Sequence, residues 1–182
     1  MELNNKIKVL FVCMGNICRS PTADAVFRHQ VRSAGLEKWI YVDSAGTHAY
    51  HIDEPPDRRA QKAALKRGYS MHELRARTVE SNDFEAFHYI LAMDKNNLAA
   101  LRERCPQQYT HKLDLLMRYS SQWDKCQEIA DPYFGGSHGF ELVLDLVEDA
   151  NQGLLKHILS QERGDSIQHR AELTAGRSRK ET

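Results

Sequence analysis

Short apolar runs separated by polar turns recur along most of the chain. The first, KIKVLFV at 6–12, is rich in apolar and β-branched residues, as expected of a buried parallel strand. Similar runs predict strands at 39–44 and 88–93, and a weaker fourth strand at 112–115.

Between these runs, apolar residues recur at helical spacing. After the first strand, Ser20 provides an N-cap, Pro21 a first helical residue and Gly35 a stop. Further helices are predicted at about 57–68 and from Asp94 onward, and an apolar stripe predicts a long amphipathic helix over 140–158.

Strands that alternate with helices predict the α/β class: a single domain with an open four-stranded parallel sheet and helices on both faces, doubly wound as in flavodoxin-like folds. We expect this domain to span 1–160. Residues 161–182 contain no aromatic residue and many charges of both signs, which predicts a disordered polar tail. In such sheets ligands bind beyond the carboxyl ends of the strands, and Cys13 follows the first strand directly.

Composition narrows the classes of function. Lys plus Arg and Asp plus Glu both number 25, and this zero net charge argues against a nucleic-acid partner. No apolar run is long enough to cross a bilayer, and no cleavage pattern follows the first strand. The 4 cysteines form no CxxC pair, so we expect a cytoplasmic protein with reduced thiols. We also expect a monomer.

The segment VCMGNICRSP combines features that suit a phosphate site. A loop between a strand and a helix N-terminus directs backbone N–H groups and the helix dipole toward an anion. Gly15 and Asn16 tolerate the backbone angles that such a loop needs, and Arg19 supplies a planar fork for phosphate oxygens. The same field favours the thiolate of Cys13, and the Ser20 hydroxyl can cap the helix and also donate to the sulfur. A Walker loop is absent.

The run from Cys13 to Pro21 resembles the signature of low-molecular-weight protein tyrosine phosphatases. DSAGT at 43–47, AMD at 92–94 and DPY at 131–133 extend the resemblance in the family's order, over nearly the whole chain to about residue 160. Two stretches depart from the family pattern. Residues 56–60 read PDRRA where many members read PDPRA, and Leu74 stands where members often have a histidine.

The resemblance implies hydrolysis of phosphotyrosine proteins or small aryl phosphates, without a cofactor or metal. Cys13 would form a phosphocysteine, Arg19 would bind the phosphate, and Asp131 would act as general acid and then base. The implied substrate-binding residues are Met14, Gly15, Asn16, Ile17, Cys18, Ser20, Tyr50, Tyr133 and Phe134, the aromatic ones as walls of a crevice. Ser44 and Asp94 would support the site, although helix capping alone also explains Asp94.

Three alternatives stay open at this point. An arsenate reductase of the same fold would need two relay cysteines, but Cys105 and Cys126 lie 21 positions apart without a relay pattern. A non-catalytic phosphoprotein-binding module would keep the phosphate loop without needing Cys13 or Asp131. Cys18 is either a buried structural thiol or the partner of Cys13 in a reversible disulfide.

Overall fold

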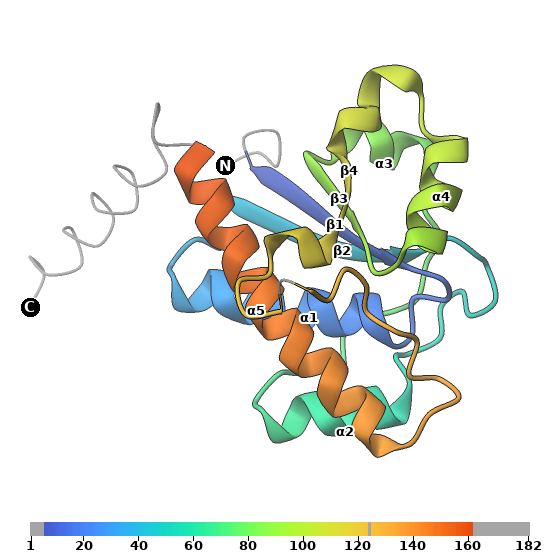
Figure 1. Ribbon diagram of the computed structural model, residues 1–182, viewed down its shortest axis with the longest axis vertical. Helices are drawn as coiled ribbons and strands as arrows, with labels where there is room; N and C mark the ends of the chain where they lie inside the picture. The colour runs from blue at the N-terminus through green and yellow to red at the C-terminus, as the bar shows by residue number, and fades with distance from the viewer. Residues whose placement is uncertain (1–5, 124, 162–182) are drawn as a thin grey trace, which may run out of the picture.

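Four short strands form one parallel sheet at the centre of the protein (Figure 1). The structure is a computed structural model that describes residues 6–123 and 125–161. Its strands are β1 (Ile7–Cys13), β2 (Ile40–Gly46), β3 (Tyr89–Ala92) and β4 (Leu113–Leu115), in the order β2-β1-β3-β4. All three pairings are parallel, which confirms the predicted sheet. The strand order reverses between β1 and β3, where doubly wound sheets bind ligands.

Helices cover both faces of this sheet, as predicted. They are α1 (Arg19–Ser33), α2 (Arg58–Lys66), α3 (Ser81–Ala86), α4 (Lys95–Arg104) and α5 (Ser137–Gln161), with the short 3-10 helices η2 (Gln107–Lys112) and η3 (Leu116–Tyr119).

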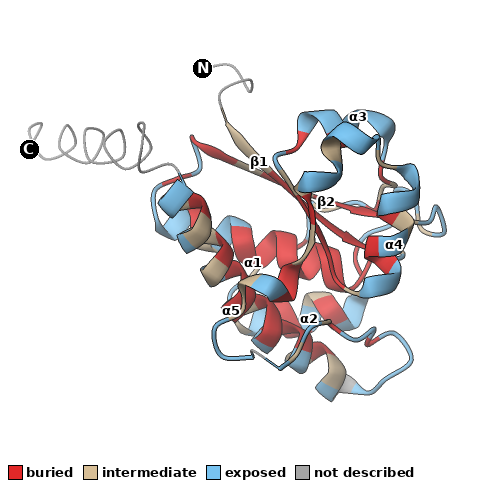
Figure 2. Ribbon diagram, turned by 45° about the horizontal axis from the view of Figure 1, so that its top comes forward, coloured by how far each residue is buried: buried red, intermediate tan, exposed pale blue. Residues whose placement is uncertain are grey.

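Side chains of β1 alternate between two cores. Val9 and Phe11 enter the core built with α1 and α5, and Leu10 and Val12 enter the core built with α3 and α4. Figure 2 shows β1 buried along most of its length.

The predicted start of the first helix was wrong. Cys18, not Ser20, occupies the N-cap position of α1, and Pro21 is the third helical residue. The hydroxyl of Ser20 lies 3.0 Å from the Cys13 sulfur and also accepts a hydrogen bond from Asn16, so it does not cap the helix. The sequence pattern also missed α3, η2 and η3, because such short helices contain too few turns to show a period.

Near the C-terminal end of the described chain, the predicted long helix is confirmed. The long amphipathic helix at 140–158 corresponds to α5, which reaches Gln161. The tail predicted from residue 161 lies, from residue 162 on, outside the described residues. Within the described part of the chain, none of the helices combines the length and the apolar character that a membrane crossing requires.

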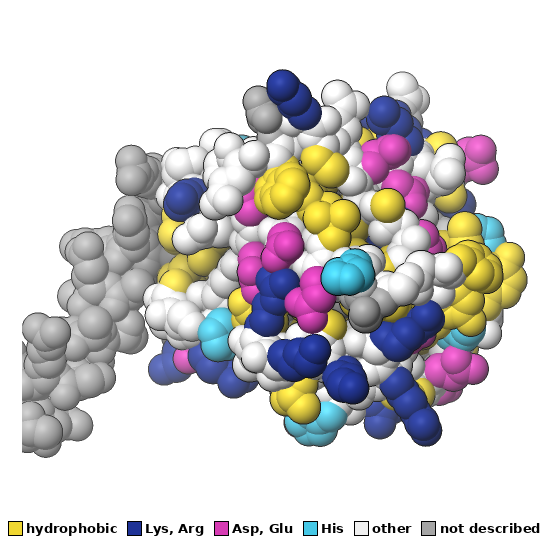
Figure 3. Space-filling view, turned by 60° about the horizontal axis from the view of Figure 1, so that its bottom comes forward, with side chains coloured by type: hydrophobic (Ala, Val, Ile, Leu, Met, Phe, Trp, Pro, Cys, Tyr) yellow, Lys and Arg dark blue, Asp and Glu magenta, His cyan; other side chains and the backbone are white. Residues whose placement is uncertain are grey.

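Ion pairs and a close backbone contact fasten α5 to the rest of the fold. Arg67, just after α2, pairs with Glu141, Asp145 and Glu148 of α5 at 2.8, 2.8 and 3.0 Å. Figure 3 shows acidic and basic side chains intermingled on the side where α2 and α5 lie. On the other flank of α5, a Cβ atom placed on Gly153 would lie 1.8 Å from the carbonyl oxygen of Tyr119. Only glycine therefore allows η3 to pack this closely on α5.

We predict that Gly153→Ala lowers the free energy of unfolding by about 1–3 kcal/mol, because the added methyl group must push η3 away from α5. Urea denaturation of the variant and of wild type measures the difference. Gln152→Ala, an exposed position on the same helix, is the control. A Gly153→Ala protein as stable as the control would contradict the packing described here.

Candidate active site

Residues 13–19, here called the Cys13 loop, connect the end of β1 to the start of α1. Cys13 is the last residue of β1 and is 2% exposed. The end of β2 passes close behind the loop: a Cβ atom on Gly46 would lie 2.7 Å from the carbonyl oxygen of Met14. The backbone N–H of Thr47 also donates a hydrogen bond to the carbonyl oxygen of Cys13, at 2.9 Å. The neighbouring strand thus supports the loop from beneath.

Asn16 fixes the shape of the loop from within. Its φ of 56° lies in the left-handed region that asparagine tolerates better than most residues. Its buried amide donates to the hydroxyls of Ser20 and Ser44, at 2.9 and 3.0 Å, and accepts a hydrogen bond from the backbone of Arg77 at 3.0 Å. Ser20, nearby in sequence, and two distant segments therefore hold one loop conformation.

The Cys13 sulfur faces hydrogen-bonding groups of its own loop. The backbone N–H of Asn16 donates to it at 3.3 Å, and the hydroxyl of Ser20 lies 3.0 Å away. Because Ser20 already accepts from Asn16, its own proton is available to the sulfur or, at 3.3 Å, to the carbonyl of Ala45. Ser20 and Asn16 thus act together on the sulfur.

Arg19 is a buried cation, 2% exposed, with acceptors from two other parts of the chain. Its Nη1 donates to Asp94 at 2.5 Å and to the carbonyl of Ile129 at 3.0 Å, and its Nη2 donates to Asp131 at 2.9 Å. Burial by itself would lower the pKa of Arg19, but Cys13, Asp94 and Asp131 together raise it. The guanidinium therefore stays charged, and its Nε is buried without a hydrogen-bond partner among the described residues.

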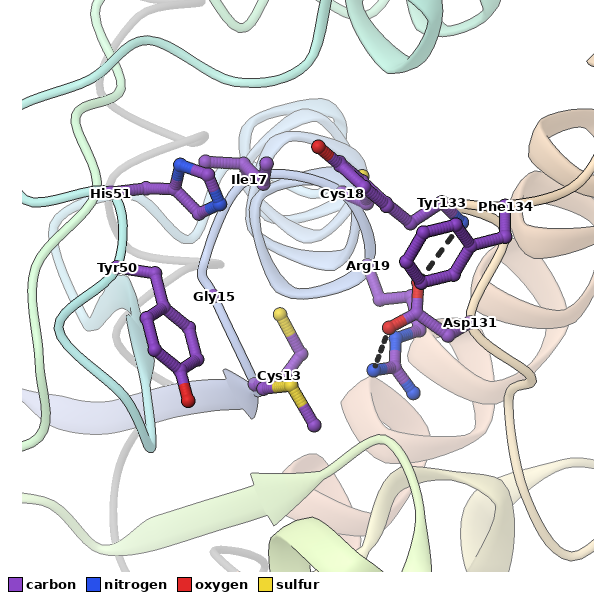
Figure 4. A pocket seen from close by; sticks show the side chains of 11 residues that line it. Cys13, Gly15, Ile17, Cys18, Arg19, Tyr50, His51, Asp131, Tyr133 and Phe134 are labelled. Carbon is purple, nitrogen blue, oxygen red and sulfur yellow. Dashed lines mark hydrogen bonds and ion pairs between the residues drawn. The ribbon is translucent and has the colours of Figure 1, made fainter.

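Asp131 opens the segment 131–136, here called the Asp131 loop, on the opposite side of Cys13 from Tyr50 (Figure 4). One carboxylate oxygen accepts from Arg19, and the other accepts from the backbone N–H of Tyr133 at 3.0 Å. The side chain remains 42% exposed. Asp131 is thus held in place and still open to the pocket.

These residues surround one pocket of about 210 Å³. Most of the residues predicted for substrate binding line it. The predicted residues that do not line it support the Cys13 loop or Arg19 by hydrogen bonds: Asn16, Ser20, Ser44 and Asp94. Asp94 both caps α4, through the N–H of Asn97 at 2.7 Å, and pairs with Arg19. The lining residues are Cys13, Met14, Gly15, Ile17, Cys18, Arg19, Tyr50, His51, Asp131, Tyr133 and Phe134.

Sequence reasoning missed two members of this neighbourhood. His51 lines the pocket and contacts Gly15, where an added Cβ atom would lie 3.0 Å from the imidazole. The carbonyl of Ile129 binds Arg19 through the backbone, so its side chain carries no signal of that role. His51 could have been suspected only from its position next to Tyr50.

Two of the four cysteines, Cys13 and Cys18, line the pocket. The thiols of Cys105 and Cys126 bond instead to nearby backbone carbonyls, of Pro106 and Glu128. This arrangement lacks the pair of relay thiols at the pocket that an arsenate reductase would need.

Comparison with known proteins agrees with this geometry. Residues 8–164 match the family model of low molecular weight phosphotyrosine protein phosphatases. The chain belongs to this family. A phosphatase of this name from Schizosaccharomyces pombe is 43% identical over 158 residues, which is 86% of this chain and 99% of the relative. The human protein of the same name is 44% identical over 137 residues, 74% of this chain and 85% of its own.

A solved phosphatase structure is similar throughout the fold. The crystal structure of protein tyrosine phosphatase from Entamoeba histolytica superposes with a TM-score of 0.83 at 40% identity, covering 86% of this chain and 99% of its own. The region that matches the family therefore runs from β1 to α5 and includes both the Cys13 loop and the Asp131 loop.

The environment of Cys18 yields a test of this site. Burial, followed by the nearby charges of Asp57, Cys13 and Asp131, raises the pKa of Cys18 from 9.0 to about 12. At about pH 8 its thiolate fraction is then roughly 10³-fold below that of an ordinary cysteine. We expect iodoacetamide to label Cys18 in a Cys13→Ser variant far more slowly than in the denatured chain, and the rate to keep rising with pH above about 10. Mass spectrometry of the labelled peptide measures both, and equal rates in the folded and denatured chains would contradict the assignment.

Proposed function

We propose that this protein hydrolyses phosphotyrosine and other aryl phosphate monoesters through a phosphocysteine on Cys13. One observation carries the proposal: a thiol, a buried guanidinium and a partly exposed carboxylate, from Cys13, Arg19 and Asp131, border a single pocket. Together they supply a nucleophile, a phosphate-binding cation and a proton donor, which are the groups that this reaction requires.

In the first step the Cys13 sulfur attacks phosphorus as the bond to the phenol oxygen breaks. The N–H groups at the start of α1 have no partner within the helix, so they can receive the equatorial phosphate oxygens. Among the described residues, the Nε of Arg19 has no hydrogen-bond partner, and the neighbouring Nη2 binds only the carboxylate of Asp131. A phosphate could occupy both in the bidentate manner that guanidinium favours.

Asp131 serves both halves of the reaction. Tyrosine has a side-chain pKa of about 10, so its oxygen leaves poorly as an anion at neutral pH and needs a proton. Protonated Asp131 donates that proton to the departing oxygen. The resulting carboxylate then takes a proton from water as the water oxygen attacks phosphorus and the S–P bond breaks, which releases phosphate and regenerates Cys13.

The walls of the pocket favour an aromatic substrate. Tyr50 and His51 lie on one side of Cys13, and Tyr133 and Phe134 on the other (Figure 4). A phosphotyrosine ring can lie between such walls while its phosphate reaches the sulfur, whereas the short side chain of phosphoserine would leave the walls uncontacted. The proposed partners are therefore phosphotyrosine proteins or small aryl phosphates.

We propose further that residues 1–160 are the catalytic domain and 161–182 a polar tail. The family match, over residues 8–164, ends within a few residues of this boundary. The chemistry needs Cys13 reduced, which fits a cytoplasmic enzyme. We propose that it acts as a monomer.

We predict phosphate release from phosphotyrosine peptides but not from phosphoserine peptides of the same sequence, without added metal. Cys13→Ser should abolish release, because a serine hydroxyl in this loop is a far weaker nucleophile than a thiolate. Malachite-green assay of free phosphate measures both. Phosphate release that persists in Cys13→Ser, or no release from wild type, would refute the proposal. If wild type releases none, phosphate binding without turnover would favour a binding module. Arsenate reduction with a thiol donor would instead favour an arsenate reductase.

We predict that Asp131→Asn lowers kcat/KM for phosphotyrosine by about 10²–10⁴-fold, because asparagine cannot protonate the leaving oxygen. For an aryl phosphate whose phenol is much more acidic than tyrosine, such as a dinitrophenyl phosphate, the loss should be far smaller. Steady-state kinetics on the two substrates tests this. An equal loss on both would mean that Asp131 acts on binding or structure rather than as the acid.

A further inference from the structure

Arg59, in the first turn of α2, contacts the Asp131 loop. Its Nη1 donates to the carbonyl oxygen of Tyr133 at 3.0 Å. Its guanidinium carbon lies 4.8 Å from the ring centre of Phe140 and 5.5 Å from that of Tyr133. A planar cation between two aromatic rings gains cation–π attraction on both sides. Arg59 therefore fixes both the backbone and the ring of Tyr133.

The contact on Tyr133 reaches the proposed acid in one further step. The carbonyl of Tyr133 accepts from Arg59, and the N–H of the same residue donates to Asp131 at 3.0 Å. The second oxygen of Asp131 binds Arg19. A phosphate that binds Arg19 would compete for that second contact. Among the described residues, the N–H of Tyr133 would then be the remaining hydrogen-bond donor to the carboxylate.

The guanidinium of Arg59 is itself held in place by Asp57. Its Nε and Nη2 bind the two oxygens of Asp57 at 3.0 and 2.8 Å. Asp57 caps α2 through the backbone of Arg59, and its own N–H donates to the carbonyl of Ile17 in the Cys13 loop at 2.7 Å. The hydrogen bonds from Arg59 lower the pKa of Asp57, which keeps the pair ionised at neutral pH.

We propose that Arg59 is a positioning residue for the general acid: it joins the Cys13 loop, through Asp57, to the Asp131 loop, through Tyr133, and so sets the distance between acid and nucleophile. This inference rests on the proposed function. It assigns a catalytic consequence to a half-exposed arginine that does not line the pocket.

The test compares Arg59→Met with Arg58→Met. Methionine keeps the length and apolar contacts of the stem but has no donor for Tyr133 or Asp57. Arg58 is the neighbouring exposed arginine of α2, and its side chain makes no hydrogen bond or ion pair with the described residues. It therefore controls for the loss of one positive charge. Arg59→Lys is the second variant, since it keeps the charge without the planar fork.

We expect Arg59→Met to lower kcat/KM for phosphotyrosine by about tenfold or more, and to have at most about a twofold effect on the dinitrophenyl phosphate. Arg59→Lys should fall between Arg59→Met and wild type, and Arg58→Met should match wild type on both substrates. Inhibition by inorganic phosphate should be unchanged in all three, because the Cys13 loop and Arg19 are intact.

A double mutant separates positioning from a general structural role. In an Asp131→Asn background, Arg59→Met should cost little further activity, since the acid that it positions is gone. An equal loss on both substrates, or an undiminished loss in the Asp131→Asn background, would overturn the role of Arg59 and leave the phosphatase activity standing. Wild type without turnover of phosphotyrosine would overturn the proposed function, and this inference with it.

Discussion

The buried guanidinium of Arg19 is the charge around which the site is organised. A cation that is 2% exposed costs several kcal/mol unless acceptors surround it. Those acceptors come from the start of α4, through Asp94, and from the segment before α5, through the carbonyl of Ile129 and through Asp131. Compensating one charge therefore brings segments more than 70 residues apart in sequence to the end of β1. The same charge is then in place to receive an anionic substrate.

The position of this charge follows from the topology of the sheet. Because the strand order reverses between β1 and β3, the loop after β1 opens into a crevice and is not covered by the next connection. The loop then depends on its neighbours for its shape: Asn16 bonds to Ser20 and Ser44, and Gly46 allows β2 to approach the backbone of Met14. Fold and site are thus specified by the same contacts, so a substitution beneath the loop affects both.

What the sequence predicts well is local. Apolar runs predicted the four strands, and an apolar stripe predicted the long last helix. Cys13 and Arg19 lie in one uninterrupted loop. Asp131 is 112 positions from Arg19, and only the family resemblance connected the two. Ser20 was expected both to cap the helix and to donate to the Cys13 sulfur. Its hydroxyl does lie 3.0 Å from the sulfur, but the loop conformation places Cys18, not Ser20, at the N-cap position. The missed contacts of His51 and Ile129 depend on loop geometry or on backbone atoms, which leave no pattern in the sequence.

Asp131 accepts hydrogen bonds from Arg19 and from the backbone of Tyr133, and a bound phosphate would affect these two contacts differently. The contact with Arg19 neutralises the guanidinium while the pocket is free of phosphate, but a phosphate dianion would compete for the same Nη2 and repel the carboxylate. The contact with Tyr133 is to a neutral N–H, for which a phosphate on Arg19 would not compete. An acid that had only the first anchor would leave its position just as the leaving group needs a proton. Arg59, by fixing Tyr133 to the first turn of α2, supplies the anchor that does not depend on the charge in the pocket. The position of Asp131 would then matter most when a substrate phosphate occupies the pocket, and that is the state in which we propose that Arg59 holds it.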